Sequence, residues 1–218
     1  MKKKILITAA LICVFALLGA GTFAYFQSQK NLTNYFAVAG VSDIYDDDAT
    51  VNANELFSIR LDEAVYQAAG RTEEGNVYKD ILPGDLLAKD PTVTNTGKYD
   101  AWVRVKLAVS DAAAWQAACQ KHGITDLTTI FGGFDATAWT RYDAPSVAND
   151  TITYVFYLNA ELAPEAQAVL FESFTVPGAF DSDDLSSLAT FNIEITAEAI
   201  QVRNTADNAV EAFQKWEP

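Results

Sequence analysis

The chain has 218 residues, of which 50% are hydrophobic and 12% aromatic, so it can form a packed core and is too apolar for a wholly disordered chain. Its 29 acidic and 15 basic residues give a net charge of −14, and we expect no nucleic acid among its partners because phosphates would be repelled. A single histidine, His122, excludes zinc sites that need several histidines, and two cysteines, Cys13 and Cys119, are too few for a disulfide framework.

The N-terminus has the layout of a secretory signal peptide. Three lysines precede an uncharged run, residues 5–18, and small residues follow it. Thr22 and Ala24 suit the positions three and one before a signal-peptidase cut, so we expect cleavage between Ala24 and Tyr25. An uncleaved membrane anchor is the alternative, because the uncharged run extends to Ser28 and approaches the ~20 residues that span a bilayer.

Export of the chain would leave a strongly acidic protein. Residues 1–24 contain three of the 15 basic residues and none of the 29 acidic ones, so their removal leaves a net charge of −17. We expect the protein to be secreted, in the extracellular matrix or at the cell surface, with membrane contact only through the signal segment. Its expected organisation is a signal peptide (1–24), an N-terminal segment (25–40), a β-sandwich domain (41–202) and a helical tail (203–218).

β-strand patterns dominate the chain after the signal peptide. Residues 101–110 alternate between the two faces of a strand, residues 151–158 are β-branched and aromatic, and residues 191–200 alternate from end to end. No strand–helix alternation of βαβ spacing occurs, so the sequence predicts a mainly β fold, a two-sheet antiparallel jelly-roll-like sandwich with short helical insertions. Weaker strand patterns cover residues 35–41, 55–61, 92–95, 139–142 and 170–176.

Helical patterns are few. Residues 111–122 fit a helix with Ser110 or Asp111 as its N-cap, and residues 207–216 fit a second helix. Residues 183–188 suggest a short helical turn.

Cys119 and His122 lie three residues apart on the apolar face of the first helix, which also carries Trp115. One interpretation is a thiolate–imidazole pair, but no third group that would orient it is evident. The other is structural packing beside Trp115, which we favour because free cysteine is often simply buried.

An acidic loop around Asp43, Asp46 and Asp48 raises the question of calcium. An EF-hand beginning at Asp46 fails because Val51 replaces the required glycine and Phe57 replaces the bidentate glutamate. A weak calcium site of another kind and a solvated acidic loop both stay open. The chain has no Gly-x-Ser-x-Gly, no His-Glu-x-x-His and no phosphate loop, so we expect neither a cofactor nor enzymatic activity.

A turn at Pro83, Gly84 and Asp85 stands out from the other loops. Proline suits the second position of a turn, and glycine can take the positive φ that follows. The turn leads into a short strand, a further turn at residues 95–97 and then the long strand from residue 101, which is an antiparallel sandwich unit.

These features together resemble a known family. The signal end, residues 19–26, resembles signal peptides cut by the SipW-type signal peptidase of Gram-positive spore-formers. The sequence Leu-Pro-Gly-Asp at 82–85, with Lys-Asp at 89–90 and Asn-Thr-Gly at 95–97, resembles the first-sheet motif of the TasA/camelysin family. Residues 193–201 resemble the last core strand of that family.

The resemblance implies a jelly-roll domain that serves as a subunit of biofilm-matrix or cell-surface fibres, with copies of itself or related matrix proteins as partners. In the family, the segment freed by cleavage can act as a donor strand that completes the sheet of the next subunit. Here that segment would be residues 25–40, whose apolar side chains are Phe26, Leu32, Tyr35, Phe36 and Val38.

Two other functions stay open. A monomeric surface binding module, for instance for glycans, could use Trp102, Trp139 or Tyr142, and exposed aromatic side chains on one face would favour it. Camelysins have been described as metallopeptidases, and a metal site of carboxylates around His122 would favour a camelysin-like peptidase. No metal-binding motif is present, so we do not carry that activity over to this chain.

Overall fold

The computed structural model describes residues 27–38, 58–63, 70–71, 75–188 and 190–216. In the described residues, the elements in chain order are β1 (Gln27–Val38), β2 (Ile59–Asp62), β3 (Gly70–Arg71), β4 (Asn76–Ile81), β5 (Leu86–Ala88), β6 (Thr92–Asn95), β7 (Ala101–Ser110), α2 (Ala112–Lys121), the 3₁₀ helix η1 (Leu127–Ile130), β8 (Phe131–Gly132), β9 (Trp139–Ala148), β10 (Thr151–Leu158), β11 (Gln167–Val169), β12 (Ser173–Thr175), α3 (Ser182–Ser187), β13 (Thr190–Gln201) and α4 (Ala209–Trp216).

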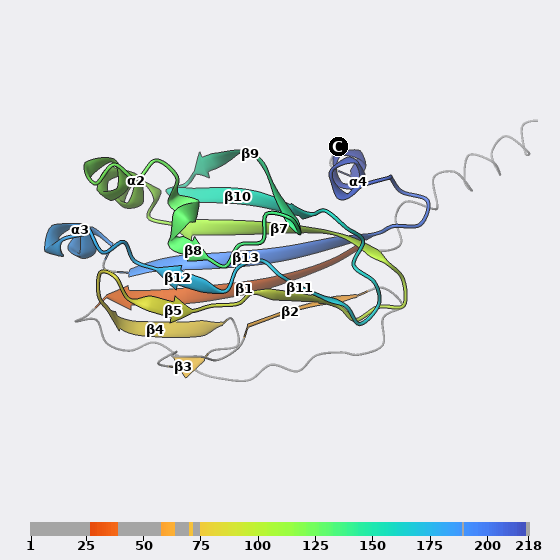
Figure 1. Cartoon of the computed structure of the whole chain (residues 1–218), viewed down its shortest axis with the longest axis horizontal. Coiled ribbons are helices and arrows are strands. Elements are labelled where there is room, and N and C mark those ends of the chain that lie inside the picture. Colours follow the sequence, from red (N-terminus) through yellow and green to blue (C-terminus); the bar gives the residue numbers. More distant parts are fainter. Residues whose placement is uncertain (1–26, 39–57, 64–69, 72–74, 189, 217–218) are drawn as a thin grey trace, which may run out of the picture.

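The fold is mainly β, as the sequence predicts, and consistent with a β sandwich. A seven-stranded sheet has the order β3-β4-β1-β13-β7-β10-β9, and two three-stranded sheets have the orders β11-β6-β2 and β5-β12-β8. Among the described strands every ladder is antiparallel except that between β1 and β4, which is parallel. Figure 1 shows α2 and α3 near one end of the large sheet and α4 near the other.

The core lies between the large sheet and the two smaller ones. The alternation in β7 buries Val103, Val105 and Leu107 on one face, as expected for a half-buried strand. Across the core, the ring of Phe174 in β12 lies 5.8 Å from that of Phe191 in β13. Burial of these apolar side chains is the main force that holds the layers together.

Near one end, the other face of the large sheet is covered by α4 (Figure 1). Phe213 of this helix is fully buried and packs with Trp102, Tyr157 and Ile200. The guanidinium of Arg104, on the same face, lies 4.4 Å from the ring centre of Phe213. The C-terminal helix therefore shields Arg104 from water, whereas Lys106 of the same strand is partly exposed.

The expected helices are confirmed with small shifts in their bounds, and the N-cap of α2 is Asp111, one of the two residues expected there. Asp111 occupies the N-cap position with φ 59° and its side chain makes no capping hydrogen bond. Asp150 caps the helix instead: its carbonyl accepts from the N–H of Ala112 at 2.9 Å, and its Oδ1 accepts from that of Ala113 at 2.9 Å. The cap therefore comes from the β9–β10 turn, which is distant in sequence.

Candidate functional site

β1 is the first strand of the described chain, yet it lies inside the large sheet. It pairs antiparallel with β13 from Gln27 opposite Ile200 to Ala37 opposite Thr190, and parallel with β4 on its other side. Leu32, at the middle of β1, is buried. The candidate donor segment thus occupies a complete slot in its own sheet (Figure 1).

The other donor-strand candidates are placed only in part. Tyr35 and Phe36 lie in β1 opposite Asn192 and Phe191, and Val38 stands opposite Ile81 of β4. Phe26 lies outside the described residues.

The two outer strands of the large sheet are poor templates for further strands. In the described chain β3 has only two residues. At the other edge, the β9 ladder is interrupted: residues 143–145 lie opposite the single residue Tyr154, and Pro145 stands in this bulge. Bulges and proline on edge strands are known devices against edge-to-edge association.

The turn at Pro83, Gly84 and Asp85 has a structural role. Gly84 has φ +87°, and the N–H of Asp85 donates to the carbonyl of Leu82 at 3.1 Å, which confirms the expected turn. Asp85 Oδ2 also accepts from the N–H of Leu82 at 2.8 Å, and the N–H of Gly84 donates to the carbonyl of Val176 at 2.8 Å. The turn therefore ties β4 and β5 to the chain beyond β12.

Lys89 and Asn95, which follow this turn in the sequence, are polar residues buried in the fold. Lys89 is fully buried, and its Nζ donates to Glu63 Oε1 at 2.9 Å. Burial lowers the pKa of Lys89, while the charge and hydrogen bond of Glu63 act in the opposite direction. Asn95 is also fully buried and donates from Nδ2 to the carbonyls of Tyr99 and Leu162, both at 2.8 Å. These contacts give both residues a structural role within the fold.

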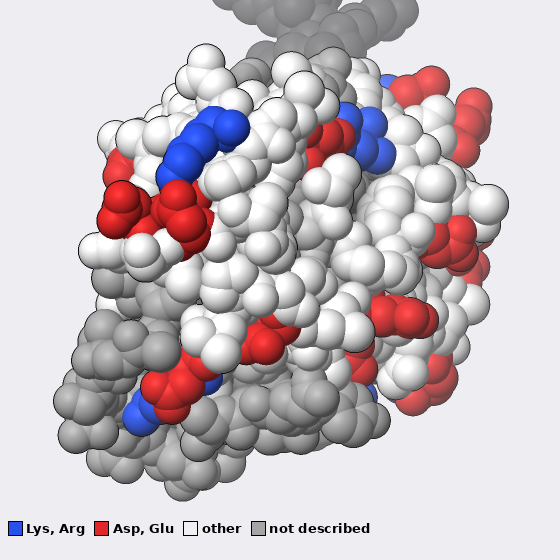
Figure 2. Space-filling view, turned by 60° about the vertical axis from the view of Figure 1, so that its left-hand side comes forward, with Lys and Arg blue, Asp and Glu red and all other residues white. Residues whose placement is uncertain are grey.

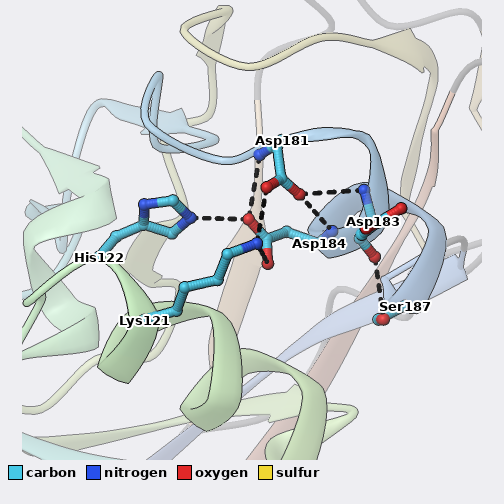
Figure 3. Close-up of polar contacts among 6 residues, drawn as sticks. All are labelled: Lys121, His122, Asp181, Asp183, Asp184 and Ser187. Carbon is cyan, nitrogen blue, oxygen red and sulfur yellow. Dashed lines mark hydrogen bonds and ion pairs between the residues drawn. The ribbon is translucent and has the colours of Figure 1, made fainter.

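A cluster of ionisable side chains joins the end of α2 to the start of α3 (Figure 3). His122 Nε2 lies 2.7 Å from Asp184 Oδ2, and Lys121 Nζ contacts Asp181 Oδ2 at 2.6 Å and Asp184 Oδ1 at 3.0 Å. Asp181 is the N-cap of α3 and forms a capping box with Asp184, which fixes both carboxylates relative to the helix. Asp184 is buried, whereas Asp181 is exposed.

Hydrogen bonds keep Asp184 ionised. Its Oδ2 accepts from the backbone N–H of Asp181 at 3.0 Å, and this bond, with those from His122 and Lys121, holds the pKa of Asp184 well below its usual range despite the opposing effect of burial. No local sequence pattern predicts this arrangement, because 62 residues separate His122 from Asp184.

Cys119 has the structural role that we favoured. It is a buried free cysteine, and burial raises the pKa of its thiol, which disfavours the nucleophilic thiolate. The imidazole of His122 contacts Asp184, and its ring centre lies 5.5 Å from that of Phe180.

The aromatic residues proposed for a surface binding module are mostly interior, which corrects that expectation. Trp139 is 1% exposed and donates from Nε1 to the carbonyl of Val169 at 2.7 Å. Trp102 is 4% exposed and lies under α4. Tyr142 is half-buried and its hydroxyl accepts from Gln214 at 2.7 Å. No exposed aromatic row is formed by these three residues.

Several expectations concern residues that the structure does not describe. The signal peptide 1–24, the cleavage positions Thr22, Ala24 and Tyr25, and the acidic loop with Asp43, Asp46 and Asp48 all lie outside the described residues. Of the helices in the described part of the chain, none is long and apolar enough to span a bilayer.

The surface shows the acidic excess of the sequence. In Figure 2, acidic side chains are scattered over the visible face and outnumber the basic ones.

Comparison of the chain with protein-family models, with curated proteins and with solved structures finds no match.

Proposed function

We propose that the chain is a secreted structural subunit of extracellular-matrix or surface fibres, and that it assembles by donating its N-terminal strand, β1, to the next copy. The observation that carries the proposal is the position of β1 between β13 and β4, with residues 39–58 between it and β2. A segment of this length can reach up to about 3.3–3.6 Å per residue, which is far enough to enter a neighbouring molecule.

Withdrawal of β1 would create an acceptor slot in the large sheet. β13 and β4 would each lose a ladder partner, and the unpaired N–H and C=O groups would be a template for an incoming strand. The β1 of a second copy offers the same sequence and can restore the same register. Strand exchange therefore loses few native contacts, as in domain swapping. When each copy donates its strand to the next one, head to tail, the assembly can grow into a fibre.

The outer edges of the sheet support the same route. The bulge at residues 143–145 and the two-residue strand β3 make lateral addition of strands unfavourable at both ends of the sheet. Growth through the internal slot avoids these edges.

Jelly-roll topology, export through a SipW-type signal peptidase and an origin in the TasA/camelysin family belong to this proposal. The layering of a seven-stranded sheet against two shorter sheets supports the jelly roll. The motif at residues 82–97 and the signal layout at residues 1–24 support the family and the export route.

A disulfide staple between β1 and β13 tests strand donation directly. Asn31 and Thr196 stand opposite each other, and opposed residues in antiparallel strands have Cα atoms about 4.5–5.5 Å apart, within the range for a disulfide. We expect the oxidised Asn31→Cys/Thr196→Cys monomer to form no fibres by electron microscopy until it is reduced. Fibres assembled first and oxidised afterwards should give a ladder of covalent multimers on non-reducing gels.

A matched staple between β7 and β10 controls for the cysteines themselves. Ala108 and Thr153 are also opposed, and both strands stay in one subunit during the proposed exchange. The Ala108→Cys/Thr153→Cys variant should form fibres when oxidised and should give no ladder. If the oxidised β1–β13 staple formed fibres as well as the oxidised control staple, β1 would not be exchanged. Oxidised fibres that yield only monomer bands would lead to the same conclusion.

A camelysin-like metallopeptidase is the second candidate, because His122 meets the carboxylates of Asp181 and Asp184. It predicts zinc-dependent cleavage of an unfolded protein substrate that a chelator and the Asp184→Asn change both abolish. The monomeric binding module loses support from the burial of Trp102 and Trp139.

A further inference from the structure

We propose that His122, Asp181 and Asp184 form a binding site for a divalent metal ion of the zinc class, in which the ion takes the place of the Lys121 ammonium group. The proposal goes beyond fibre assembly and does not depend on it. It rests on a nitrogen donor and two carboxylates that two different elements bring together at one point (Figure 3).

The donor atoms are already close to the spacing that a metal needs. One atom from each of the three residues lies within 4.8 Å of the others. A tetrahedral zinc ion about 2.0–2.2 Å from each donor sets donor–donor distances of about 3.3–3.6 Å. His122 Nε2 and Asp184 Oδ2, now 2.7 Å apart, would have to separate to this spacing. Asp181 caps α3 through Oδ1, so its Oδ2, which now contacts Lys121, is the atom that would bind the ion.

The two elements hold the donors firmly. His122 is the C-cap residue of α2, and its ring packs against Phe180 with centres 5.5 Å apart. Asp181 and Asp184 are fixed by the capping box of α3. Ordered ligands lose little conformational freedom when an ion binds, which favours affinity.

Lys121 shows that the cluster accepts a cation. Its Nζ lies between the two carboxylates, in contact with both, although about half of the side chain is exposed to solvent. An ammonium on a long flexible stem can leave without disturbing the backbone. A metal ion would provide two charges at the same place and would add a bond to the imidazole nitrogen.

The donor set selects the class of ion. Imidazole with carboxylates suits zinc and neighbouring transition metals, whereas calcium and magnesium prefer oxygen alone. His122 must then present an unprotonated Nε2 and keep its proton on Nδ1. The three protein ligands would leave a further coordination position for water.

The single histidine makes the test specific. We would titrate the purified, tag-free protein with Zn²⁺ and follow the imidazole nitrogens of His122 by NMR, which gives signals from one residue only. Isothermal titration calorimetry supplies the affinity and stoichiometry. We expect one Zn²⁺ per chain with a shift of the Nε2 signal, and no comparable shift with Ca²⁺.

Variants separate metal ligation from simple charge. Asp181→Asn and Asp184→Asn should each weaken Zn²⁺ binding by at least about tenfold, because even indirect partners of a metal site are worth that much. Asp183 of the same helix is exposed, and Asp183→Asn is the matched control that removes a charge but no ligand. If Asp184→Asn impairs folding, the exposed Asp181 still provides the test.

Lys121 gives the most discriminating test, because we expect its removal to strengthen zinc binding but to destabilise the metal-free protein. Lys121→Ala should raise Zn²⁺ affinity several-fold, while it lowers the stability of the metal-free protein. Lys98→Ala, at an exposed lysine elsewhere, should change neither. Unshifted His122 signals at saturating Zn²⁺, or weaker binding in Lys121→Ala than in Lys98→Ala, would overturn the proposal and leave the cluster as an ionic link between α2 and α3.

Discussion

Leu32 of β1 stands directly opposite Ile195 of β13, and both side chains are buried in the structure. Directly opposed residues share one face of an antiparallel ladder, so this pair places the centre of β1 over the core. Attachment of β1 to its own subunit therefore depends on side-chain packing as well as on ladder hydrogen bonds.

Replacing Leu32 with alanine should lower the free energy of unfolding by about 2–5 kcal/mol, because it removes buried methyl groups and leaves a cavity. Denaturant unfolding of the soluble protein measures this. Lys30 lies on the same strand and is exposed, so Lys30→Ala should change stability by no more than about 0.5 kcal/mol. Equal, small effects of both changes would mean that β1 is not packed as described.

Lys89 and Glu63 make the second prediction. Glu63→Gln removes the counter-charge of a fully buried ammonium and should cost about 3–5 kcal/mol. The pKa of Lys89 is already lowered by burial, so the unfolded state binds its proton more readily, and stability rises with pH between the folded and unfolded pKa values.

Loss of Glu63 lowers that folded pKa further, so the cost of Glu63→Gln should shrink as the pH approaches the unfolded value near 10.5. Thermal unfolding at neutral and alkaline pH compares the variant with the parent. The double change Lys89→Met/Glu63→Leu removes both charges and should be less harmful than Glu63→Gln at pH 7. If the loss of stability caused by Glu63→Gln did not depend on pH, a buried charge would not be its cause.

The capping of α2 gives a third prediction. Asp150 has φ 56°, so Asp150→Gly is the suitable change: it removes the acceptor of the Ala113 N–H, tolerates the positive φ and should lower the free energy of unfolding by about 1 kcal/mol. Asp111→Asn keeps a residue type that tolerates positive φ and alters a side chain with no capping bond, so it should be nearly neutral. A larger effect at Asp111 than at Asp150 in chemical unfolding would show that the side chain of Asp111, and not that of Asp150, stabilises the start of α2.

The elements predicted well were those whose signal is local. β7, β10 and β13 have long alternating or β-branched patterns, and α2 and α4 have a 3.6-residue period, so both kinds of element follow from periodicity alone. β3, β4, β5, β8 and β11 were missed because they are short and interrupted by charged or small residues. β1 begins at Gln27, eight residues before the expected strand at 35–41. β9 extends six residues past the expected 139–142 because a bulge breaks its alternation.

The site depends on contacts that no local pattern encodes. The parallel pairing of β1 with β4, the cap from Asp150 and the approach of His122 to Asp184 each join residues far apart in sequence. Lys89 appears polar and solvent-exposed in the sequence, and its burial becomes evident only when Glu63 is brought beside it. Sequence patterns therefore predict the sheets and helices, while tertiary packing determines the polar clusters.

The cleavage site gives a fourth prediction. A signal peptidase needs small residues at positions three and one before the cut, so Ala24→Arg should block processing and keep the protein in the membrane fraction. N-terminal sequencing of the secreted parent should begin at Tyr25. Ala20→Arg changes a residue outside those two positions and provides a comparison. A secreted form that begins well away from Tyr25 would place the cut elsewhere.

The net charge of −17 expected after cleavage gives the last prediction, which concerns assembly. Carboxylates on neighbouring copies repel one another, so association should strengthen as pH falls from 7 to 5 towards the sequence pI of about 4.3. Hydrogen bonds from Thr137 and Lys121 lower the pKa of Asp135 and Asp181, so these two stay ionised and less constrained carboxylates take up the protons first.

Light scattering across this pH range measures the effect on assembly. Salt at pH 7 is the control, because screening shortens the Debye length from about 8 Å at 0.15 M to about 3 Å at 1 M and should promote association without protonation. The oxidised Asn31→Cys/Thr196→Cys staple should respond to neither change if assembly proceeds through β1. Weaker association on acidification, with the protein still folded, would show that charge repulsion does not limit assembly.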